Sequence, residues 1–289
     1  MGRSPYPGEW GCLMLVNQTV LITGCSTGIG RSLAEEFAGR GHRVVATARK
    51  PETLDTLRGE SIVRLALDVN DPESVARAVD DAIAAVGHID MLVNNAGYGQ
   101  MGPIIDLSAE QIRDQLETNV VGLVGMMQAV APHMIARKRG RIVNVGSISG
   151  ILTTPFAGIY CASKAAVHSI SEAARMELAP FGIDVIMVQP GGVLSRFGET
   201  ASERVDLKPD SPYQRFAKGI AARARASQSN GTPSEIVAKQ IVDAVTRDAA
   251  PAVVRVGHGG QLYPALKRLL PTRRIDAMLM KRFGLLSTR

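Results

Sequence analysis

Tyr160 and Lys164 are the residues of this 289-residue chain whose types and spacing point most directly to chemistry. They lie four positions apart, so on a helix they share one face. A phenol is a poor acid or base near neutral pH because its ordinary pKa is about 10, and a neighbouring cation favours the phenolate. The pair therefore predicts acid–base catalysis by Tyr160 beside Lys164, although the same spacing also arises by chance on polar helix faces.

A glycine-rich turn lies between the first predicted strand and the first predicted helix, over residues 23–30. Glycines let the backbone approach a phosphate, and the following helix N-terminus adds N–H donors and the positive end of its dipole. The spacing is Gly-x-x-x-Gly-x-Gly rather than the commoner dinucleotide fingerprint Gly-x-Gly-x-x-Gly. The turn predicts a phosphate site formed by Gly24, Ser26, Thr27, Gly28, Ile29 and Gly30.

The end of the second predicted strand bears on the choice of nucleotide. A carboxylate there would bind the ribose 2′-hydroxyl of NAD, whereas an arginine accommodates the 2′-phosphate of NADP. Residues 46–50 hold no acid and end in Arg49 and Lys50, and the planar guanidinium of arginine suits a phosphate. We therefore expect NADP(H) to be favoured over NAD(H), with Arg49 at the phosphate; the alternative is that both cations are ordinary surface charges.

Later predicted strands are also followed by residues suited to a nucleotide. Asp68 follows the third strand and is placed to accept a hydrogen bond from an adenine amino group. Asn95, Ala96 and Gly97 follow the fourth strand, where small residues permit close approach and amides can hold the loop. Open α/β sheets bind ligands at the carboxyl ends of their strands. These residues therefore extend the predicted nucleotide site.

Strand-like and helix-like apolar segments alternate along the chain. Strands are expected over residues 19–23, 43–47, 62–67, 90–93, 141–145, 183–188 and 252–256, and helices over 29–40, 72–86, 109–137, 159–178 and 233–246. Such alternation is typical of a parallel sheet covered on both faces. We predict a single α/β domain over residues 18–260, doubly wound and Rossmann-like, with a seven-stranded parallel sheet.

Three segments depart from this alternation. Residues 1–17 carry no fold signal, which indicates either a disordered extension or a true start at Met14. Residues 191–232 are polar and only partly helix-like, which predicts a mobile loop that walls the substrate site. Residues 261–289 form a basic amphipathic tail. We expect the tail to pack over the pocket or contact a partner, in preference to a membrane surface.

Composition argues against several classes of function. Much of the net charge of +6 lies in the tail, and 4% aromatic residues without a nucleic-acid motif do not indicate nucleic-acid binding. The three cysteines and five histidines show no metal-ligand spacing, disulfide framework or hydrolytic triad. We expect no bound metal, and we expect the histidines to be exposed at the surface or hydrogen-bonded. The cysteines predict a reducing, cytoplasmic compartment. No stretch approaches the ~20 apolar residues of a membrane span, and the N-terminus does not resemble a signal peptide.

Together these motifs resemble those of the short-chain dehydrogenase/reductase family. The resemblance covers roughly residues 18–256 and rests, in family order, on the turn over 23–30, Asn94-Asn95-Ala96-Gly97, Asn119, Ser147, Tyr160-x-x-x-Lys164 and Pro190-Gly191. It implies that Tyr160 is the acid in carbonyl reduction and the base in alcohol oxidation. Lys164 would lower the pKa of Tyr160 and bind the nicotinamide ribose, and Ser147 would hydrogen-bond the substrate oxygen. Asn119 would hold a water of the proton relay.

The resemblance also has implications for substrate and assembly. It places backbone groups of Gly191 and Val193, after Pro190, near the nicotinamide carboxamide, with Ser195 where threonine is frequent. It implies a lipophilic, steroid- or retinoid-like carbonyl or alcohol, and a homodimer or homotetramer formed through helices 109–137 and 159–180. Candidate apolar residues for the substrate pocket are Met101, Ile104, Leu152, Phe156, Phe197 and Phe216.

Two other functions remain open from the sequence. A nucleotide-binding regulator could keep the fold without turnover, although such proteins usually lose the tyrosine or lysine that this chain retains. An epimerase or dehydratase of the extended relatives would commonly carry Gly-x-x-Gly-x-x-Gly at the first turn and a larger substrate domain, and neither is present.

Overall fold

A seven-stranded parallel sheet forms the centre of the computed structural model, which describes residues 14–205 and 207–286. Its spatial order is β3-β2-β1-β4-β5-β6-β9. The strands are β1 (Thr19–Ile22), β2 (Arg43–Ala48), β3 (Ile62–Ala66), β4 (Met91–Asn94), β5 (Gly140–Val145), β6 (Ile183–Pro190) and β9 (Val253–Val256). The order reverses between β1 and β4, the point at which doubly wound sheets bind ligands. The predicted single-domain, Rossmann-like fold is confirmed.

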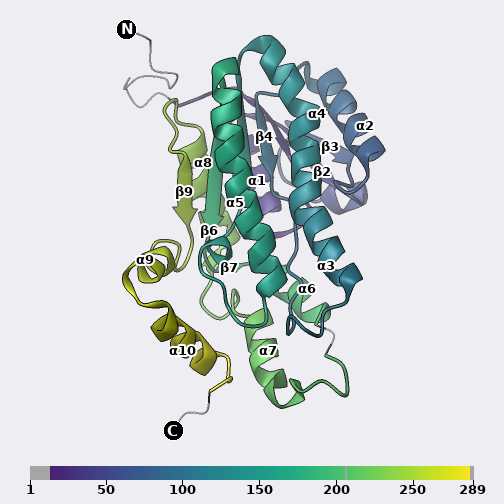
Figure 1. Cartoon of the computed structure of the whole chain (residues 1–289). Helices are drawn as coiled ribbons and strands as arrows, with labels where there is room; N and C mark the ends of the chain where they lie inside the picture. Colours follow the sequence, from purple (N-terminus) through teal and green to yellow (C-terminus); the bar gives the residue numbers. More distant parts are fainter. Residues whose placement is uncertain (1–13, 206, 287–289) are drawn as a thin grey trace.

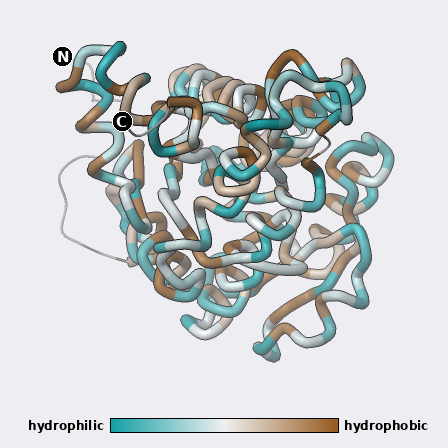
Figure 2. Tube along the Cα trace, turned by 90° about the horizontal axis from the view of Figure 1, so that it is seen from below, coloured by the Kyte–Doolittle hydropathy of each residue, from teal (hydrophilic) through white to brown (hydrophobic). Residues whose placement is uncertain are grey.

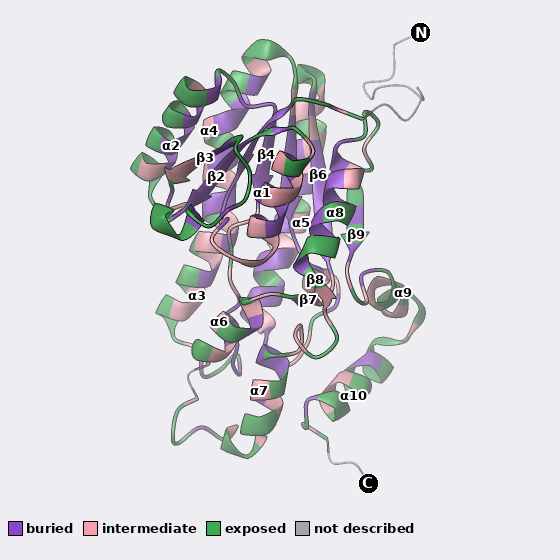
Figure 3. Ribbon diagram, turned by 180° about the vertical axis from the view of Figure 1, so that it is seen from behind, coloured by how far each residue is buried: buried purple, intermediate pink, exposed green. Residues whose placement is uncertain are grey.

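Helices cover both faces of this sheet (Figures 1 and 3). On one face, α1 (Gly28–Gly39) and α8 (Ser234–Val245) pack with Val20 and Ile22 of β1. On the other, α2 (Pro72–Val86), α4 (Gly122–Arg137) and α5 (Gly158–Leu178) pack with Leu21. Successive side chains of a strand point to opposite faces, so one apolar run supplies both cores.

The segment predicted as one helix over residues 109–137 contains two kinds of helix. It consists of α3 (Ala109–Leu116), a π-helical segment over Glu117–Val121 and α4, with Pro132 inside α4. By length and composition this segment could cross a membrane, so the expectation that no stretch approaches such a span was wrong. Its Met126, Val130 and Met134 are buried in the core of the domain, and a core helix is apolar for the same reason as a membrane helix.

The predicted loop over residues 191–232 contains regular structure. It holds α6 (Phe197–Glu203), α7 (Ala217–Ala224) and β7 (Val193–Leu194), which pairs with β8 (Thr232–Pro233). The tail forms two helices, α9 (Leu262–Leu269) and α10 (Thr272–Arg282), because Pro271 separates them. Figures 1 and 3 show α7, α9 and α10 at the carboxyl end of the sheet, and Figure 2 looks onto this end.

The two predicted end segments have different outcomes. Residues 1–13 of the predicted extension lie outside the described residues. Met14 forms an antiparallel bridge with Arg247, and the Leu15 N–H donates to Thr246 O at 2.6 Å. Pairing with the fold therefore begins before the predicted boundary at residue 18. The homo-oligomer stays a prediction, and Val121 and Met176 are exposed apolar residues on the helices expected to form it.

Candidate active site

The glycine turn has the backbone conformation that a phosphate site requires. Gly24 and Gly28 have φ angles of +72° and +60°, which side chains rarely adopt. Thr27 precedes α1 without a side-chain hydrogen bond to the helix, so its side chain does not occupy the first N–H groups of α1. A Cβ at Gly30 would collide with Gly24 O and Asn95 Nδ2. The turn therefore fits the pyrophosphate of a dinucleotide.

Asn95 and Thr23 lock this turn to the loop that follows β4. Thr23 Oγ1 accepts hydrogen bonds from the N–H groups of Asn95 at 3.0 Å and Ala96 at 2.9 Å. In return, Asn95 Nδ2 donates to Thr23 O at 2.9 Å and Gly24 O at 3.1 Å. Gly30 packs below the turn and does not line the cavity, so it supports the turn by close packing. Its predicted contact with the cofactor stays a prediction.

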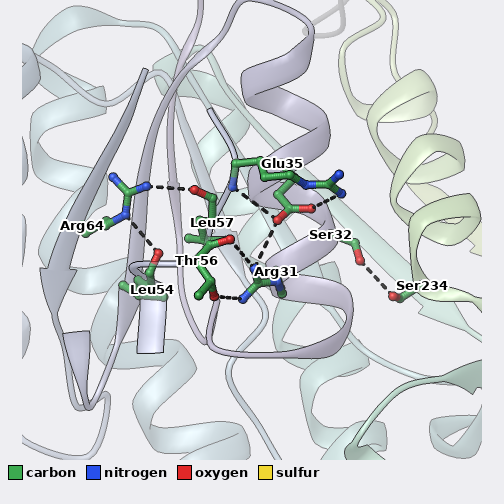
Figure 4. A network of polar contacts seen from close by, with 9 residues as sticks. Arg31, Ser32, Glu35, Leu54, Thr56, Leu57, Arg64 and Ser234 are labelled. Carbon is green, nitrogen blue, oxygen red and sulfur yellow. Dashed lines mark hydrogen bonds and ion pairs between the residues drawn. The ribbon is translucent and has the colours of Figure 1, made fainter. Parts of the chain in front are cut away.

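Arg49 lies at the nucleotide end of the cavity, at the start of a firmly anchored segment. Its side chain is exposed and lines the cavity together with Asp68. The chain just after it is tied down by a polar network (Figure 4). Arg31 donates to Thr56 Oγ1 at 3.0 Å, and Arg64 donates to Leu54 O at 3.0 Å. These bonds anchor residues 54–57, which follow Arg49 in the chain.

Ser147, Tyr160 and Lys164 line the same cavity as the glycine turn, and all three are buried. Ser147 follows β5, and its Oγ accepts a hydrogen bond from Ser149 N at 3.0 Å. Tyr160 and Lys164 lie in the first turns of α5, where Lys164 Nζ donates to Val145 O at 2.9 Å. The fold thus brings together three of the four residues predicted to be catalytic.

Asn119 lies in the π-helical segment and does not line the cavity. Its Oδ1 accepts from Tyr98 N at 3.1 Å, and its Nδ2 donates to Tyr98 O and to Ser163 Oγ, each at 3.0 Å. A side chain at Gly97 would lie 2.9 Å from Asn119 Oδ1 and 3.7 Å from Lys164 Nζ. The Asn119 amide therefore fastens the loop after β4 to α5, beside the lysine. Its water-holding role stays a prediction.

The electrostatics of Tyr160 differ from the expectation. Burial raises its pKa above the usual value, while a hydrogen bond with Ser147 and the charge of Arg223 lower it. Burial also lowers the pKa of Lys164 to about 8. Among the described residues, Arg223 is thus a cation that lowers the Tyr160 pKa, and the predicted effect of Lys164 stays a prediction.

The cavity has a volume of about 870 Å³ and extends from the glycine turn to α10. The predicted cofactor residues other than Gly30 line it, including Pro190, Gly191 and Val193. Of the six apolar candidates, Leu152 and Phe197 do so. Met101 and Phe156 are instead buried in apolar clusters, Phe216 packs in the Phe156 cluster, and Ile104 is exposed.

Sequence reasoning missed several residues of the substrate end. The cavity is also lined by Thr154, Thr200, Arg204, Arg223, Leu279, Arg282 and Phe283. One signal was available: Ile220, Arg223 and Ala224 have the spacing of one helical face, and all three are buried. His168 is partly buried and hydrogen-bonded to the backbone of Ser147. Its Nε2 has no partner among the described residues, and burial lowers its pKa to about 4.

Comparison with known proteins decides the family. A sequence model of the family described as short chain dehydrogenase matches residues 18–206. The chain belongs to the short-chain dehydrogenase family. It is an oxidoreductase with the nicotinamide-nucleotide fold of that family.

Relatives of this short-chain dehydrogenase match along nearly the whole chain. The uncharacterized oxidoreductase YbbO of Escherichia coli is 34% identical over 267 residues, which are 92% of this chain and 95% of that protein. A Burkholderia phymatum short-chain dehydrogenase/reductase in complex with NAD has 27% identity and a TM-score of 0.76, covering 93% of this chain and 96% of that one. A Burkholderia cenocepacia short-chain dehydrogenase in complex with NADP has 26% identity and a TM-score of 0.73, covering 93% and 100%.

Proposed function

We propose that this short-chain dehydrogenase uses NADP(H) to interconvert a lipophilic carbonyl compound and its alcohol. The observation that carries the proposal is one continuous cavity that joins the phosphate turn over residues 24–28 to Ser147, Tyr160 and Lys164. A nucleotide held by its phosphates at one end would therefore extend toward an acid–base group at the other. Leu152, Phe197 and Phe283 add apolar lining at that end.

The protein residues would divide the chemistry between them. Bound NADPH would supply the hydride. Tyr160 would give its proton to the carbonyl oxygen, and its raised pKa keeps that proton in place at neutral pH. Ser147 would stabilise the negative charge that develops on the same oxygen. In the oxidative direction the same two groups would take the proton and orient the alcohol.

Arg49 supports the choice of NADP(H). It is the cation after β2 that lines the cavity, whereas the adjacent Lys50 does not. A guanidinium pairs with a phosphate through two parallel hydrogen bonds. Since the two related structures hold NAD and NADP respectively, family membership leaves both nucleotides open, and the proposal rests on this arginine.

The proposed reaction is tested by following NADPH and NADH oxidation with a panel of aliphatic, aromatic and polycyclic ketones and aldehydes. Tyr160→Phe is expected to lower kcat/KM by about 10²–10⁴-fold while leaving NADPH affinity nearly unchanged. Tyr213→Phe is the matched control, because Tyr213 packs with Phe156 and does not line the cavity. Full activity of Tyr160→Phe would refute the proposed acid.

The nucleotide preference has its own pair of variants. Arg49→Asp is expected to weaken NADPH binding by about 10²-fold, consistent with loss of about 2–3 kcal/mol from a charge-assisted pair, and to favour NADH. Lys50→Asp makes the same charge change one residue away and should move the preference much less. Isothermal titration measures the affinity of both variants for each nucleotide. Equal changes of nucleotide preference in the two variants would contradict the assignment of Arg49 to the 2′-phosphate.

A further inference from the structure

Arg223 is a buried cation at the substrate end of the cavity, with only 8% of its surface exposed. It belongs to α7, and its Nε donates to Thr154 Oγ1. The Cys161 thiol also lies within hydrogen-bonding reach of Arg223. Neither group is a carboxylate, and among the described residues Arg223 forms no ion pair with an aspartate or glutamate.

A second buried arginine shows how this protein satisfies such a group when its role is structural. Arg141 is 7% exposed and pairs with Asp184 at 3.1 Å. It also donates to three backbone carbonyls, those of Val245, Arg247 and Asp248, at 2.6–3.0 Å. Arg223 has comparable burial without comparable partners. Because a buried charge is retained only when it is compensated, the counter-charge of Arg223 is expected to arrive with a ligand.

The second charge at this site has the same sign. Arg282 of α10 also lines the cavity, and its positive charge disfavours the charged form of Arg223. Two segments distant in sequence thus bring guanidinium groups to one end of the cavity. Arg282 is solvent-exposed, with Tyr263 Oη as an acceptor at 3.4 Å. The local field therefore favours an anion.

The nucleotide phosphates do not account for this anion. The phosphate turn and Arg49 lie at the carboxyl ends of β1 and β2. Arg223 instead lies against Thr154 and near Tyr160 and Cys161 of α5. The anion that Arg223 would bind therefore belongs to the molecule that reacts at Tyr160.

We propose that Arg223 binds a carboxylate of the substrate, so that this enzyme acts on oxo acids and hydroxy acids with an apolar body. The inference rests on the proposed function and narrows its substrate class. Hydride from NADPH would reduce the carbonyl carbon, the Tyr160 proton would go to the oxygen, and the carboxylate would remain unchanged. Arg282 would add a second, more exposed contact, and Leu152, Phe197 and Phe283 would surround the apolar body.

The probes for this proposal are 2-oxo-4-phenylbutanoate and 4-oxo-4-phenylbutanoate, two spacings of ketone and carboxylate, each with its neutral amide. Calorimetry measures their binding to the protein loaded with NADP⁺, where no turnover occurs. We expect at least one carboxylate to bind ten-fold or more tightly than its amide. Arg223→Gln should abolish that difference, and Arg223→Lys should restore part of it.

Arg225→Gln is the matched control, because Arg225 ends the same helix and is exposed. It should leave the carboxylate preference unchanged. Equal binding of acids and amides by the wild-type protein overturns the proposal even if the Arg223 variants fail to fold. A preference that survives in folded Arg223→Gln overturns it too.

Turnover of the same four compounds with NADPH separates this proposal from the general function. One outcome is that the carboxylates bind in a manner that depends on Arg223 but none of the compounds is reduced. This outcome would support the anion site and count against the oxidoreductase proposal for these ketones. Reduction of the acids and the amides with equal kcat/KM would support the oxidoreductase proposal and overturn the contact between Arg223 and a substrate carboxylate. If the Arg223 variants lower kcat for acids and amides alike, shift the pH profile and keep the preference for acids over amides unchanged, Arg223 acts on the pKa of Tyr160. That result would overturn the substrate contact.

Discussion

On the nucleotide side of the cavity, residues meet as the carboxyl ends of neighbouring parallel strands, while on the substrate side they meet across α7, α10 and the loop before α5. The nucleotide side is joined by short hydrogen bonds such as those between Thr23 and Asn95. The substrate side is joined by a small apolar cluster of Phe156, Ile220 and Phe283. The hydrogen-bonded nucleotide side tolerates little displacement of its atoms, because a hydrogen bond weakens steeply when its distance or angle departs from the preferred range.

The two sides of the cavity are therefore suited to different ligands. A hydrogen-bonded turn suits a ligand that is always the same, such as a nucleotide phosphate. Apolar contacts between separate helices are non-directional, so the substrate wall can change its side chains without disturbing the turn. We therefore expect perturbations on the two sides to separate into nucleotide effects and substrate effects.

The first prediction concerns the nucleotide side and fills the space below the turn. In Gly30→Ala the new methyl group would meet the backbone oxygen of Gly24 and the amide of Asn95. The turn must then shift, and we expect NADPH affinity to fall by about 10²-fold or more, about 2.7 kcal/mol. Titration of NADPH fluorescence measures the loss.

Gly39→Ala is the control on the same helix, because a Cβ there meets nothing within 4 Å. It should keep nucleotide affinity and stabilise the protein by roughly 0.5–1 kcal/mol, the usual advantage of alanine over glycine in a helix. Similar nucleotide affinities in the two variants would contradict the role given to Gly30.

The second prediction concerns Lys164, where the two sides meet. Its pKa falls from 10.5 to about 8 on burial, so the folded protein bears the cost of a buried charge below pH 8. Between about pH 8 and 10.5 the unfolded chain still binds the proton that the folded chain has released. The contribution of Lys164 to stability therefore rises with pH in this window.

Lys164→Met removes that dependence. Relative to wild type, its free energy of unfolding should decline by up to about 3 kcal/mol between pH 7.5 and 10.5. Urea denaturation of the nucleotide-free proteins across this range measures the difference. A constant difference would show that burial does not hold the lysine pKa down.

The smallest expected effect concerns the substrate wall. Phe283 is 4% exposed and packs against Phe156 and Ile220, whereas Leu269 of the same tail is 76% exposed. Phe283→Ala should loosen α10 and raise KM for an apolar ketone by about ten-fold, about 1.4 kcal/mol, with NADPH affinity unchanged. Leu269→Ala should alter neither.

Hydrogen exchange over residues 272–283 provides the structural readout for this variant. Faster exchange with unchanged KM would separate the tail from the substrate site. A fall in NADPH affinity equal to the change in KM would contradict the independence of the two sides.

Much of the nucleotide side could be predicted because its residues follow strands directly. Asp68 and Asn95 come just after β3 and β4, and parallel strands bring their carboxyl ends to one edge wherever they lie in the sheet. The proposed catalytic pair was equally local, since Tyr160 and Lys164 are neighbours on one face of a helix. The π-helical segment around Asn119 was not predicted, because apolar periodicity does not reveal one extra residue in a turn.

The residues of the substrate side were not predicted from the sequence, because their contacts join segments that are far apart in the chain. Arg223 and Arg225 are two positions apart in an alanine-rich helix, yet one is buried beside Tyr160 and the other is exposed. Ile104 and Phe156 looked equally suitable as pocket residues, and neither lines the cavity.

The alternation of strands and helices, the phosphate turn and the Tyr160–Lys164 pair can be predicted from the amino-acid sequence, because each depends on residues close together in the chain. The charge around Tyr160 and the shape of the substrate end follow instead from the packing of the folded protein. Those properties depend on which side chains lose water when α7 and α10 pack beside α5, and burial of that kind is set by the whole fold.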